Sequence, residues 1–342
     1  MTQHNEAALR AALGEILNRH GASHAGIALG IVRPEGRIVL SVGRASVDRV
    51  DAPNADTVFE IGSITKVFTA LVLADMVEER IVALDDPVQR FLPQLTMPVR
   101  SRPITLGDLA THTSGLPRLP KGSLWIGLRH RENPYVAFTP AHLDRAICET
   151  RRRSPGGRPR YSNFGFGLLG HVLALQSGTS YAQLVHDRVC QPIGLGDTSI
   201  GLEPEDLSRF ADGHNRKGRT VPHWDLPTLP GAGALRSTVT DMLRFAQFQL
   251  DPPETRLGRA VSATQEIRAK RGPFGQGLGW MSLPVRGLHQ DVLWHNGGTG
   301  GFRSYIGLVT ATGSAVVVLS NCTRGVDRIG QEALLAMHHD AT

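Results

Sequence analysis

The segment Phe59–Leu71, with the sequence FEIGSITKVFTAL, places a lysine in the first turn of a predicted buried helix. The residues after Lys66 are apolar on nearly every side, which is typical of a helix inside a hydrophobic core. A cation is unfavourable at a helix N-terminus, because the helix dipole already places positive charge there. Ser63 can cap the helix, but a capping box would have Glu or Gln at position 66. Helix stability therefore does not explain Lys66.

Lysine is rare in this chain, since only 4 of the 37 Lys and Arg residues are lysines. Arginine keeps its proton in proteins, whereas a buried lysine can lose it. Ser63 and Lys66 are three residues apart, so that their side chains share a helix face. A serine hydroxyl becomes nucleophilic when a base takes its proton, and a desolvated amine can be that base. The alternative is a capping serine beside a lysine that extends to solvent.

The composition is typical of a globular protein, with 342 residues, 41% of them hydrophobic and 20% charged. This length allows one large domain or two ordinary ones. The net charge of +6 raises nucleic acid as a partner, but the densest basic cluster, residues 151–160, is broken by Pro and Gly. No nucleic-acid motif accompanies it, so we expect a solvated loop and no nucleic-acid partner. Three separated cysteines predict neither a disulfide framework nor a metal site.

The N-terminal segment and the apolar runs bear on localisation. Charged residues interrupt residues 1–21 at helical spacing, which leaves no apolar core for a secretory signal. No apolar run approaches the length of a membrane span. We therefore expect a cytoplasmic enzyme without a membrane partner, unless a leader precedes this chain.

Strand patterns gather near both ends of the chain. Residues 25–46 contain two β-rich runs joined by Pro34-Glu35-Gly36, which is a hairpin signal. Residues 304–321 repeat the pattern around a turn near Thr312-Gly313, and residues 291–296 can add a third strand there. The sequence therefore predicts an antiparallel sheet built from the two ends.

Helical patterns at residues 5–19 and 327–338 accompany these strands. Strands at both ends with a helix-rich middle predict one sheet domain with an inserted helical domain. We assign residues 1–79 and 286–342 to an α/β sheet domain and residues 80–285 to a mainly helical inserted domain, with the active site between them.

A second candidate motif is Tyr161-Ser162-Asn163, which follows a Pro/Gly-rich loop and precedes a helix-like run. Side chains two residues apart in an extended loop point the same way. Tyrosine can relay a proton if a cation lowers its pKa, and asparagine can hold the amide or ester of an acyl substrate by hydrogen bonds. The alternative is a loop that caps the following helix.

The third motif is HNGGTGG at residues 295–301. H-x-G alone is weak, because His24-Ala25-Gly26 matches it as well. This copy closes a strand, and its glycines allow a backbone N–H to approach a substrate carbonyl, as half of an oxyanion hole requires. The alternative is a glycine-rich loop with an incidental histidine.

The order S-x-x-K, Y-x-N, H-x-G resembles the signature motifs of class C β-lactamases and their relatives. These relatives are D-alanyl-D-alanine peptidases, D-aminopeptidases, and β-lactamase-like esterases and transesterases. The resemblance extends from about Val58 to Asn321 and includes FEIGSITKVFTALVLADMVEE, LDDPVQRFLP, ITLGDLATHTSGLP, RYSNFGFGLLGHVL, GAGALRSTVTDMLRF and HNGGTGGFRS. It implies a β-lactamase/transpeptidase-like fold of the α/β (α+β) type, with a five-stranded antiparallel sheet flanked by helices and a mainly helical inserted domain.

The resemblance also implies catalytic roles. Ser63 would be the acylated nucleophile, and Lys66 and Tyr161 would share the role of general base. The backbone N–H groups of Ser63 and Gly298 would form the oxyanion hole. His112, in the segment HTSGLP, is interpreted as a turn residue and not as a triad base.

The substrate-binding residues implied by the resemblance include the third motif. They are Asn163, His295, Asn296 and Gly297. One departure matters, because His295-Asn296-Gly297 stands where β-lactamases carry Lys-Thr-Gly. That lysine helps to bind a substrate carboxylate, whereas histidine is largely neutral at pH 7, so anion recognition by this motif is expected to be weaker.

We therefore predict a serine hydrolase or acyltransferase that forms an acyl-enzyme on Ser63. An esterase, transesterase or amidase acting on a small-molecule acyl ester or amide is favoured. The alternative is a β-lactamase, a D-alanyl-D-alanine carboxypeptidase or a D-aminopeptidase, and a non-catalytic binding protein is much less favoured. An α/β-hydrolase is disfavoured because the chain has no G-x-S-x-G. No metal or cofactor is predicted, since H-E-x-x-H is missing as well.

Overall fold

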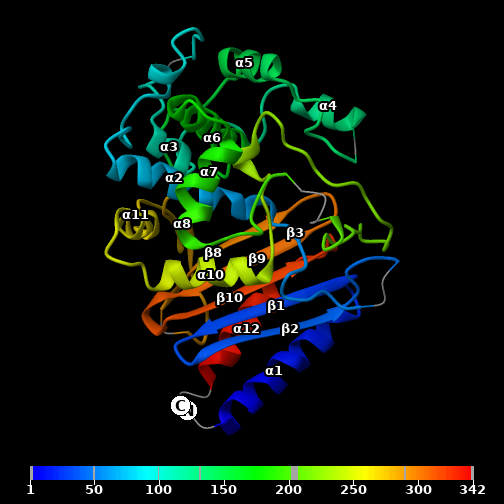
Figure 1. Ribbon diagram of the computed structural model, residues 1–342. Helices are drawn as coiled ribbons and strands as arrows, with labels where there is room; N and C mark the ends of the chain where they lie inside the picture. The colour runs from blue at the N-terminus through cyan, green and yellow to red at the C-terminus, as the bar shows by residue number, and fades with distance from the viewer. Residues whose placement is uncertain are drawn as a thin grey trace.

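A single antiparallel sheet organises the computed structural model, which describes residues 3–48, 51–98, 100–130, 132–201, 207–288 and 290–339 (Figure 1). In these ranges the sheet has eight strands in the order β2-β1-β10-β9-β8-β7-β6-β5. The long strands are β1 (Gly26–Arg33), β2 (Gly36–Gly43), β8 (Asp291–Gly298), β9 (Arg303–Val309) and β10 (Ser314–Ser320). The short strands are β5 (Ala269–Arg271), β6 (Phe274–Gln276) and β7 (Met281–Pro284). The predicted hairpin at 25–46 is confirmed as β1 and β2.

The predicted number of five strands is wrong, because β5, β6 and β7 extend the sheet beyond the five long strands. Residues 269–284, which the sequence analysis assigned to the helical domain, thus belong to the sheet. These strands have three or four residues each, which is too short to show a two-residue alternation. The division of the chain into two domains stays a prediction.

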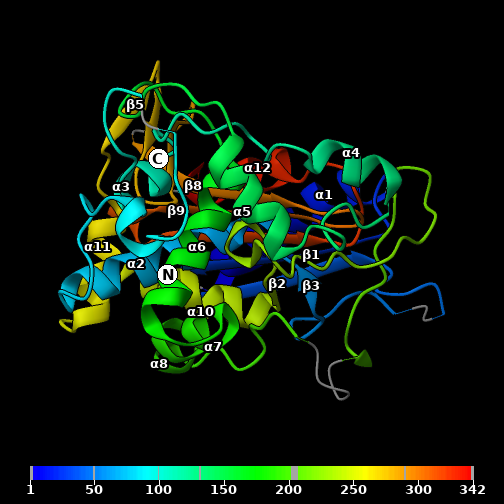
Figure 2. The same ribbon diagram turned by 90° about the horizontal axis from the view of Figure 1, so that it is seen from above.

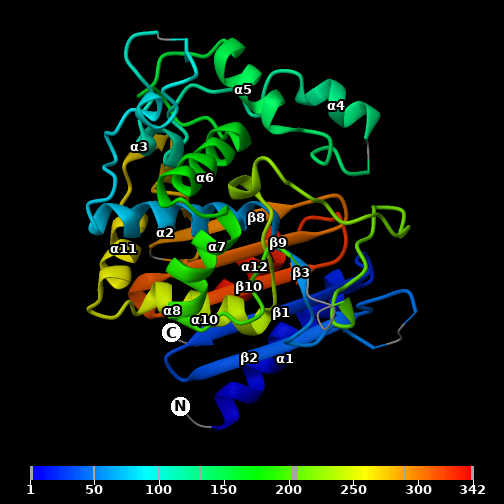
Figure 3. The ribbon, with the colours of Figure 1, turned by 45° about the horizontal axis from the view of Figure 1, so that its top comes forward.

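The central strands are apolar on both sides because helices cover both faces of the sheet. Ile27, Leu29 and Ile31 of β1 pack with helices α1 (Gln3–Gly21) and α12 (Asp327–His339). Helix α10 (Val239–Leu250) covers the opposite face, as Figures 1 and 3 show. The apolar core therefore has two layers with the sheet between them.

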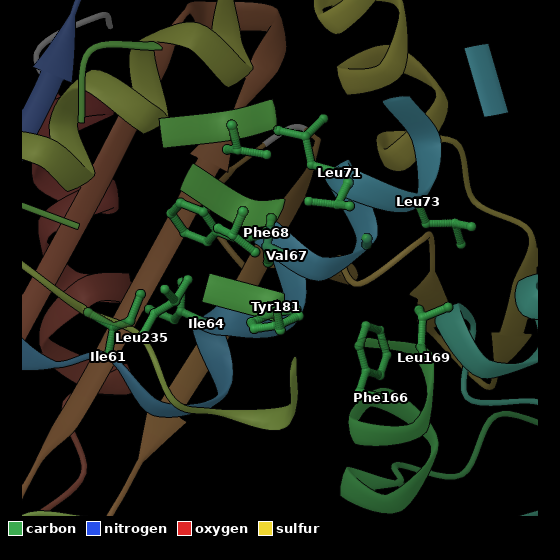
Figure 4. Packing of buried hydrophobic residues seen from close by; sticks show 14 of the residues in the cluster. Ile61, Ile64, Val67, Phe68, Leu71, Leu73, Phe166, Leu169, Tyr181 and Leu235 are labelled. Atoms are coloured by element: carbon green, nitrogen blue, oxygen red, sulfur yellow. The ribbon is translucent and has the colours of Figure 1, made fainter. Parts of the chain in front are cut away.

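Helix α2 (Thr65–Glu78) lies on the α10 side, between the strands and helix α6 (Asn163–Ser177) (Figure 4). Its residues from Thr65 to Met76 are buried, as the apolar pattern predicts. Phe68 stacks on Phe245 of α10, with 4.2 Å between the ring centres. The helix is therefore buried on all sides, and the prediction of a core helix is confirmed.

The remaining helical elements surround α2 or lie above it. Seen from above, α3, α5 and α6 lie over the sheet (Figure 2). These elements are α3 (Leu106–Ala110), α4 (Ser123–Arg129), α5 (Pro140–Glu149), α7 (Tyr181–Val185), the π-turn η3 (His186–Cys190), α8 (Gln191–Ile193) and α11 (Arg256–Gln265). Of the helices in the described ranges, none combines the length and the apolar character needed to cross a membrane.

A buried ion-pair cluster fixes the C-terminal half of α2. Asp75 is fully buried and accepts hydrogen bonds from Arg188 Nη1 at 2.6 Å and from Arg256 Nε at 2.7 Å. Arg188 belongs to η3 and Arg256 begins α11. Three segments far apart in the sequence are thus joined at one carboxylate, which orients α2 and with it the residues at its N-terminus.

Candidate active site

The first turn of α2 brings Ser63 and Lys66 into contact. Nζ of Lys66 is hydrogen-bonded to Oγ of Ser63 at 2.9 Å and donates to the carbonyl oxygen of Ala232 at 2.5 Å. Ser63 lies in the 3₁₀ turn η1 (Gly62–Ile64), and the N-terminus of α2 has no side-chain cap. Lys66 has no exposed surface. The alternative of a capping serine beside a solvent-exposed lysine is therefore excluded.

The surroundings of Lys66 favour its neutral form. Burial, and next the charge of Arg118, lower the pKa of Lys66 well below its ordinary value. Within the described ranges no carboxylate forms an ion pair with this amine. A neutral amine can donate to the Ala232 carbonyl and still offer its lone pair to the Ser63 hydroxyl. The arrangement is that of a nucleophile beside its base.

Tyr161 completes this cluster. It lines the same hollow as Ser63, and Lys66 Nζ lies 4.9 Å from the centre of its ring. Burial raises the pKa of Tyr161, and this effect exceeds the opposing effects of the Ser63 hydrogen bond and the Arg118 charge. The Arg118 charge does act to lower the pKa of this tyrosine, but burial outweighs it. The two shifts favour a neutral amine on Lys66 and a protonated hydroxyl on Tyr161.

Asn163 is the first residue of α6, directly after Ser162, whose hydroxyl caps this helix by accepting from the Gly165 N–H at 2.9 Å. Asn163 Nδ2 donates to the Tyr135 hydroxyl at 3.5 Å, and its Oδ1 is buried without a partner. Asn163 shares with Ser63 and Tyr161 a hollow of about 610 Å³. The segment Tyr161-Ser162-Asn163 therefore caps helix α6 and also contributes side chains to the site.

The end of β8 lies directly against the Ser63 turn. Gly62 has a positive φ of 52°, and a Cβ on it would lie 2.6 Å from the Gly298 nitrogen. A Cβ on Gly297 would lie 1.9 Å from the Ile61 carbonyl oxygen. Glycine is therefore required at both positions for this close approach. The contact brings the backbone at Ser63 and at Gly298 together, as a shared oxyanion hole demands.

Comparison with known proteins identifies the family to which this arrangement belongs. The sequence model described as Beta-lactamase matches residues 9–339. The chain belongs to the beta-lactamase family. It is a serine hydrolase of that family, and the predicted resemblance is confirmed.

Three relatives show how far the similarity to this family extends. The D-alanyl-D-alanine-carboxypeptidase/endopeptidase AmpH of Escherichia coli (strain K12) is 28% identical over 307 residues, which are 85% of this chain and 77% of that protein. A beta-lactamase of the same strain is 27% identical over 334 residues, covering 86% of this chain and 84% of that protein. The crystal structure of a class C beta lactamase from Rhodobacter sphaeroides superposes with a TM-score of 0.83 at 26% identity, over 98% of this chain and 99% of that chain. The predicted fold, an antiparallel sheet flanked by helices, is thereby confirmed.

His295, which differs in residue type from the lysine of the beta-lactamase motif, does not line the hollow. Asn163, Asn296 and Gly297 line the hollow, whereas His295 is fully buried behind it. Its Nδ1 donates to the Asn296 carbonyl at 2.7 Å, and its Nε2 is buried without a partner. Burial is the main cause that lowers the pKa of His295 to about 3, and the smaller share from Lys66 applies only while that amine is protonated. The expected neutral state is confirmed, but direct contact of His295 with substrate has no support.

His112 is a turn residue, as interpreted from the sequence. Its φ is +58°, and its carbonyl accepts the Arg160 N–H at 2.8 Å. Its Nδ1 accepts the Ser162 N–H at 3.1 Å, and its ring centre lies 4.6 Å from that of Tyr161. His112 therefore supports the Tyr161 loop from behind, a role that the residue types alone did not reveal.

Sequence reasoning missed three groups at the site. They are the Ala232 carbonyl, Arg118 and Arg303. Ala232 lies in the segment GAGALRSTVTDMLRF, and Arg303 is the last residue but one of HNGGTGGFRS, so both fall within stretches that carry the family resemblance. Arg118 lies with its guanidinium carbon 5.2 Å from the centre of the Tyr161 ring. In the described part of the chain, no three His, Cys, Asp or Glu side chains are arranged to hold a metal ion.

Proposed function

We propose that this enzyme hydrolyses the amide bond of small, carboxylate-bearing acyl compounds, either a β-lactam or a D-alanyl-D-alanine peptide, through an acyl-enzyme on Ser63. The observation that carries the proposal is the hydrogen bond between Ser63 and a buried Lys66 that has no ion-pair partner among the described residues. The similarity to a D-alanyl-D-alanine carboxypeptidase and to beta-lactamases supports this substrate class. The sequence analysis ranked this class second, and the relatives support it better than an esterase.

In the proposed acylation, neutral Lys66 takes the Ser63 proton while Oγ attacks the substrate carbonyl carbon. The backbone N–H groups of Ser63 and Gly298 stabilise the oxygen anion that forms. Tyr161 then gives its proton to the leaving nitrogen as the C–N bond breaks, and Lys66 returns the serine proton to Tyr161. In deacylation, water attacks the ester, a proton passes through the same groups to Ser63 Oγ, and the acid is released.

Ester hydrolysis or transesterification is the second candidate, and one observation favours it. His295, neutral and buried, replaces the motif lysine that would attract a carboxylate. Neutral esters do not need that contact. An alkoxide also leaves more readily than an amine, so that an ester depends less on Tyr161.

The test combines active-site labelling with a comparison of substrates. A fluorophosphonate probe should label Ser63 in equal molar amount, and Ser63→Ala should lower kcat/KM by about a thousandfold or more. Ser23→Ala, an exposed serine after α1, is the control and should keep full activity.

The kcat/KM values for nitrocefin, a peptide ending in D-Ala-D-Ala and p-nitrophenyl acetate then decide the substrate class. Turnover of nitrocefin or the peptide with the higher kcat/KM supports the proposal. Efficient turnover of the acetate alone supports the second candidate. Labelling at another residue contradicts the mechanism.

A further inference from the structure

The hollow beside Ser63 needs a cation if the substrate bears a carboxylate, and the structure offers one that the family motif does not. His295 lies behind the hollow and is neutral. Lys66 is fully buried with a lowered pKa. Two arginines, Arg118 and Arg303, are the guanidinium groups among the described residues that line this hollow. Of these, Arg303 is the one placed beside the oxyanion position.

Arg303 begins β9 directly opposite Gly298 of β8. A Cβ on Gly298 would lie 2.9 Å from Arg303 Nη1 and 3.1 Å from its Cζ. The guanidinium therefore lies against the Cα of Gly298, in contact with the residue proposed to hold the oxyanion. A substrate whose carbonyl oxygen lies at Gly298 places its neighbouring groups within reach of this cation.

One edge of the guanidinium is held and the other is open. Nη1 donates to the carbonyl oxygens of Thr299 at 2.9 Å and Phe302 at 2.6 Å. Nε and Nη2 form no hydrogen bond with the described residues, and no described carboxylate lies within ion-pair distance of Arg303. Burial, and next the charge of Arg216, lower the pKa of Arg303, and the opposing charge of Asp327 is too weak to offset them. Nε and Nη2 form the edge of the guanidinium that binds both oxygens of a carboxylate.

We propose that Arg303 is the carboxylate-binding residue of this enzyme and that its free edge takes over the contact for which the family motif uses a lysine. The assignment rests on the proposed function, because it supposes that the acyl-enzyme on Ser63 is formed from an anionic substrate. It identifies the substrates as acyl compounds with a carboxylate near the scissile bond, on the side where β8 turns into β9.

Asp327 adds a negative charge to the hollow that Arg303 lines. It lines the same hollow and accepts from Asn296 Nδ2 at 2.5 Å, but it does not pair with Arg303. Its negative charge opposes anion binding at longer range. If Arg303 binds the carboxylate, neutralising Asp327 strengthens the preference for anionic substrates, and this gives a change of opposite sign in the same assay.

The experiment compares two substrates with the same reacting ester that differ in charge and by one methyl group. They are a p-nitrophenyl ester whose acyl chain ends in a carboxylate, p-nitrophenyl hydrogen succinate, and its methyl ester. Arg303→Gln should lower the ratio of the two kcat/KM values about tenfold to thirtyfold, mainly through KM of the anionic substrate. Arg303→Lys should restore part of the ratio, and Asp327→Asn should raise it. Damage to the β8–β9 turn alone would lower both kcat/KM values equally and leave the ratio unchanged.

Arg118→Gln is the matched control, because it removes the other guanidinium of the hollow, and the ratio should change less than threefold. A second measurement needs no turnover. Phenylacetate should protect Ser63 from a fluorophosphonate better than phenylacetamide, and Arg303→Gln should abolish the difference.

If Arg303→Gln leaves both the kcat/KM ratio and the protection unchanged, the assignment is contradicted. If only Arg118→Gln changes the ratio, Arg118 is the carboxylate-binding residue instead. Absence of label on Ser63 contradicts the proposed acyl-enzyme itself, so the two failures are distinguishable.

Discussion

At the residue scale, Lys66 illustrates why a buried polar group is retained. Its amine is desolvated, and this burial, followed by the charge of Arg118, lowers the pKa of Lys66 well below its ordinary value. The Ala232 carbonyl offers it one hydrogen bond and Ser63 another. These two contacts suit a neutral amine with a free lone pair. The proposed proton transfer from Ser63 to Lys66 thus offers a reason for a lysine that helix stability does not explain.

The first prediction follows from this interpretation. Lys66→Arg keeps a cation at the site and should fold, yet it should lose Ser63 acylation nearly as fully as Lys66→Ala, because a guanidinium does not give up its proton. The measurement is the rate of fluorophosphonate labelling, with thermal unfolding to confirm the fold. Lys121→Arg, in an exposed pair with Glu149, is the control and should label normally. If Lys66→Arg kept most of the labelling rate, a purely electrostatic role would be the better explanation.

At the element scale, the site depends on how turn η1 meets the end of β8. Gly62 and Gly298 are in backbone contact, and Ser304 of β9 donates to the Ile61 carbonyl at 2.7 Å. This contact joins a helix N-terminus to two strands that lie more than two hundred residues away along the chain. We expect that a small displacement of β8 at this contact alters the proposed oxyanion hole while the fold stays intact.

Gly62→Ala tests this contact against a matched glycine. Gly62 has φ +52° with the Gly298 nitrogen in the way of a Cβ, whereas Gly178 has φ +69° with open space around it. Both alanines cost about 1 to 2 kcal/mol for the left-handed backbone. Gly62→Ala alone should also displace β8 and lower kcat/KM about a hundredfold, as does loss of one oxyanion donor. Equal activity of the two variants in steady-state assays would show that the contact is not required.

The elements that the sequence predicted well are those with strong local periodicity. Helix α2 and the β1–β2 hairpin follow from apolar patterns over long stretches, and the Ser63–Lys66 contact follows from helical spacing. Strands β5 to β7 do not follow from such a pattern, because these short segments pair only in the context of the sheet. The Ala232 carbonyl and Arg303 reach the site by tertiary contacts, for which no local pattern exists.

At the scale of the whole molecule, groups buried at the active site affect the stability of the fold. Ser63, Tyr161 and Gly298 come from three distant parts of the chain and line one hollow. Two histidines, His112 and His295, are buried at this junction with pKa values below the ordinary range. The fold keeps both histidines neutral, whereas the unfolded chain can protonate them. The free energy of unfolding therefore depends on pH.

The last prediction is the size and sign of this linkage. His295 has a pKa of about 3 in the fold and an ordinary value of 6.5, taken here for the unfolded chain. Below pH 6.5 the unfolded chain binds a proton that the folded chain does not. The free energy of unfolding is therefore highest above pH 6.5 and decreases as the pH falls toward 3. At pH 5 this one group lowers the free energy of unfolding by about 2 kcal/mol.

His295→Gln should therefore reduce, by about that amount, the loss of unfolding free energy between pH 7.5 and pH 5 in urea titrations. His130→Gln, an exposed histidine after α4, should leave the loss unchanged. The same acid sensitivity in His295→Gln and in the parent chain would show that His295 is not held neutral by its burial.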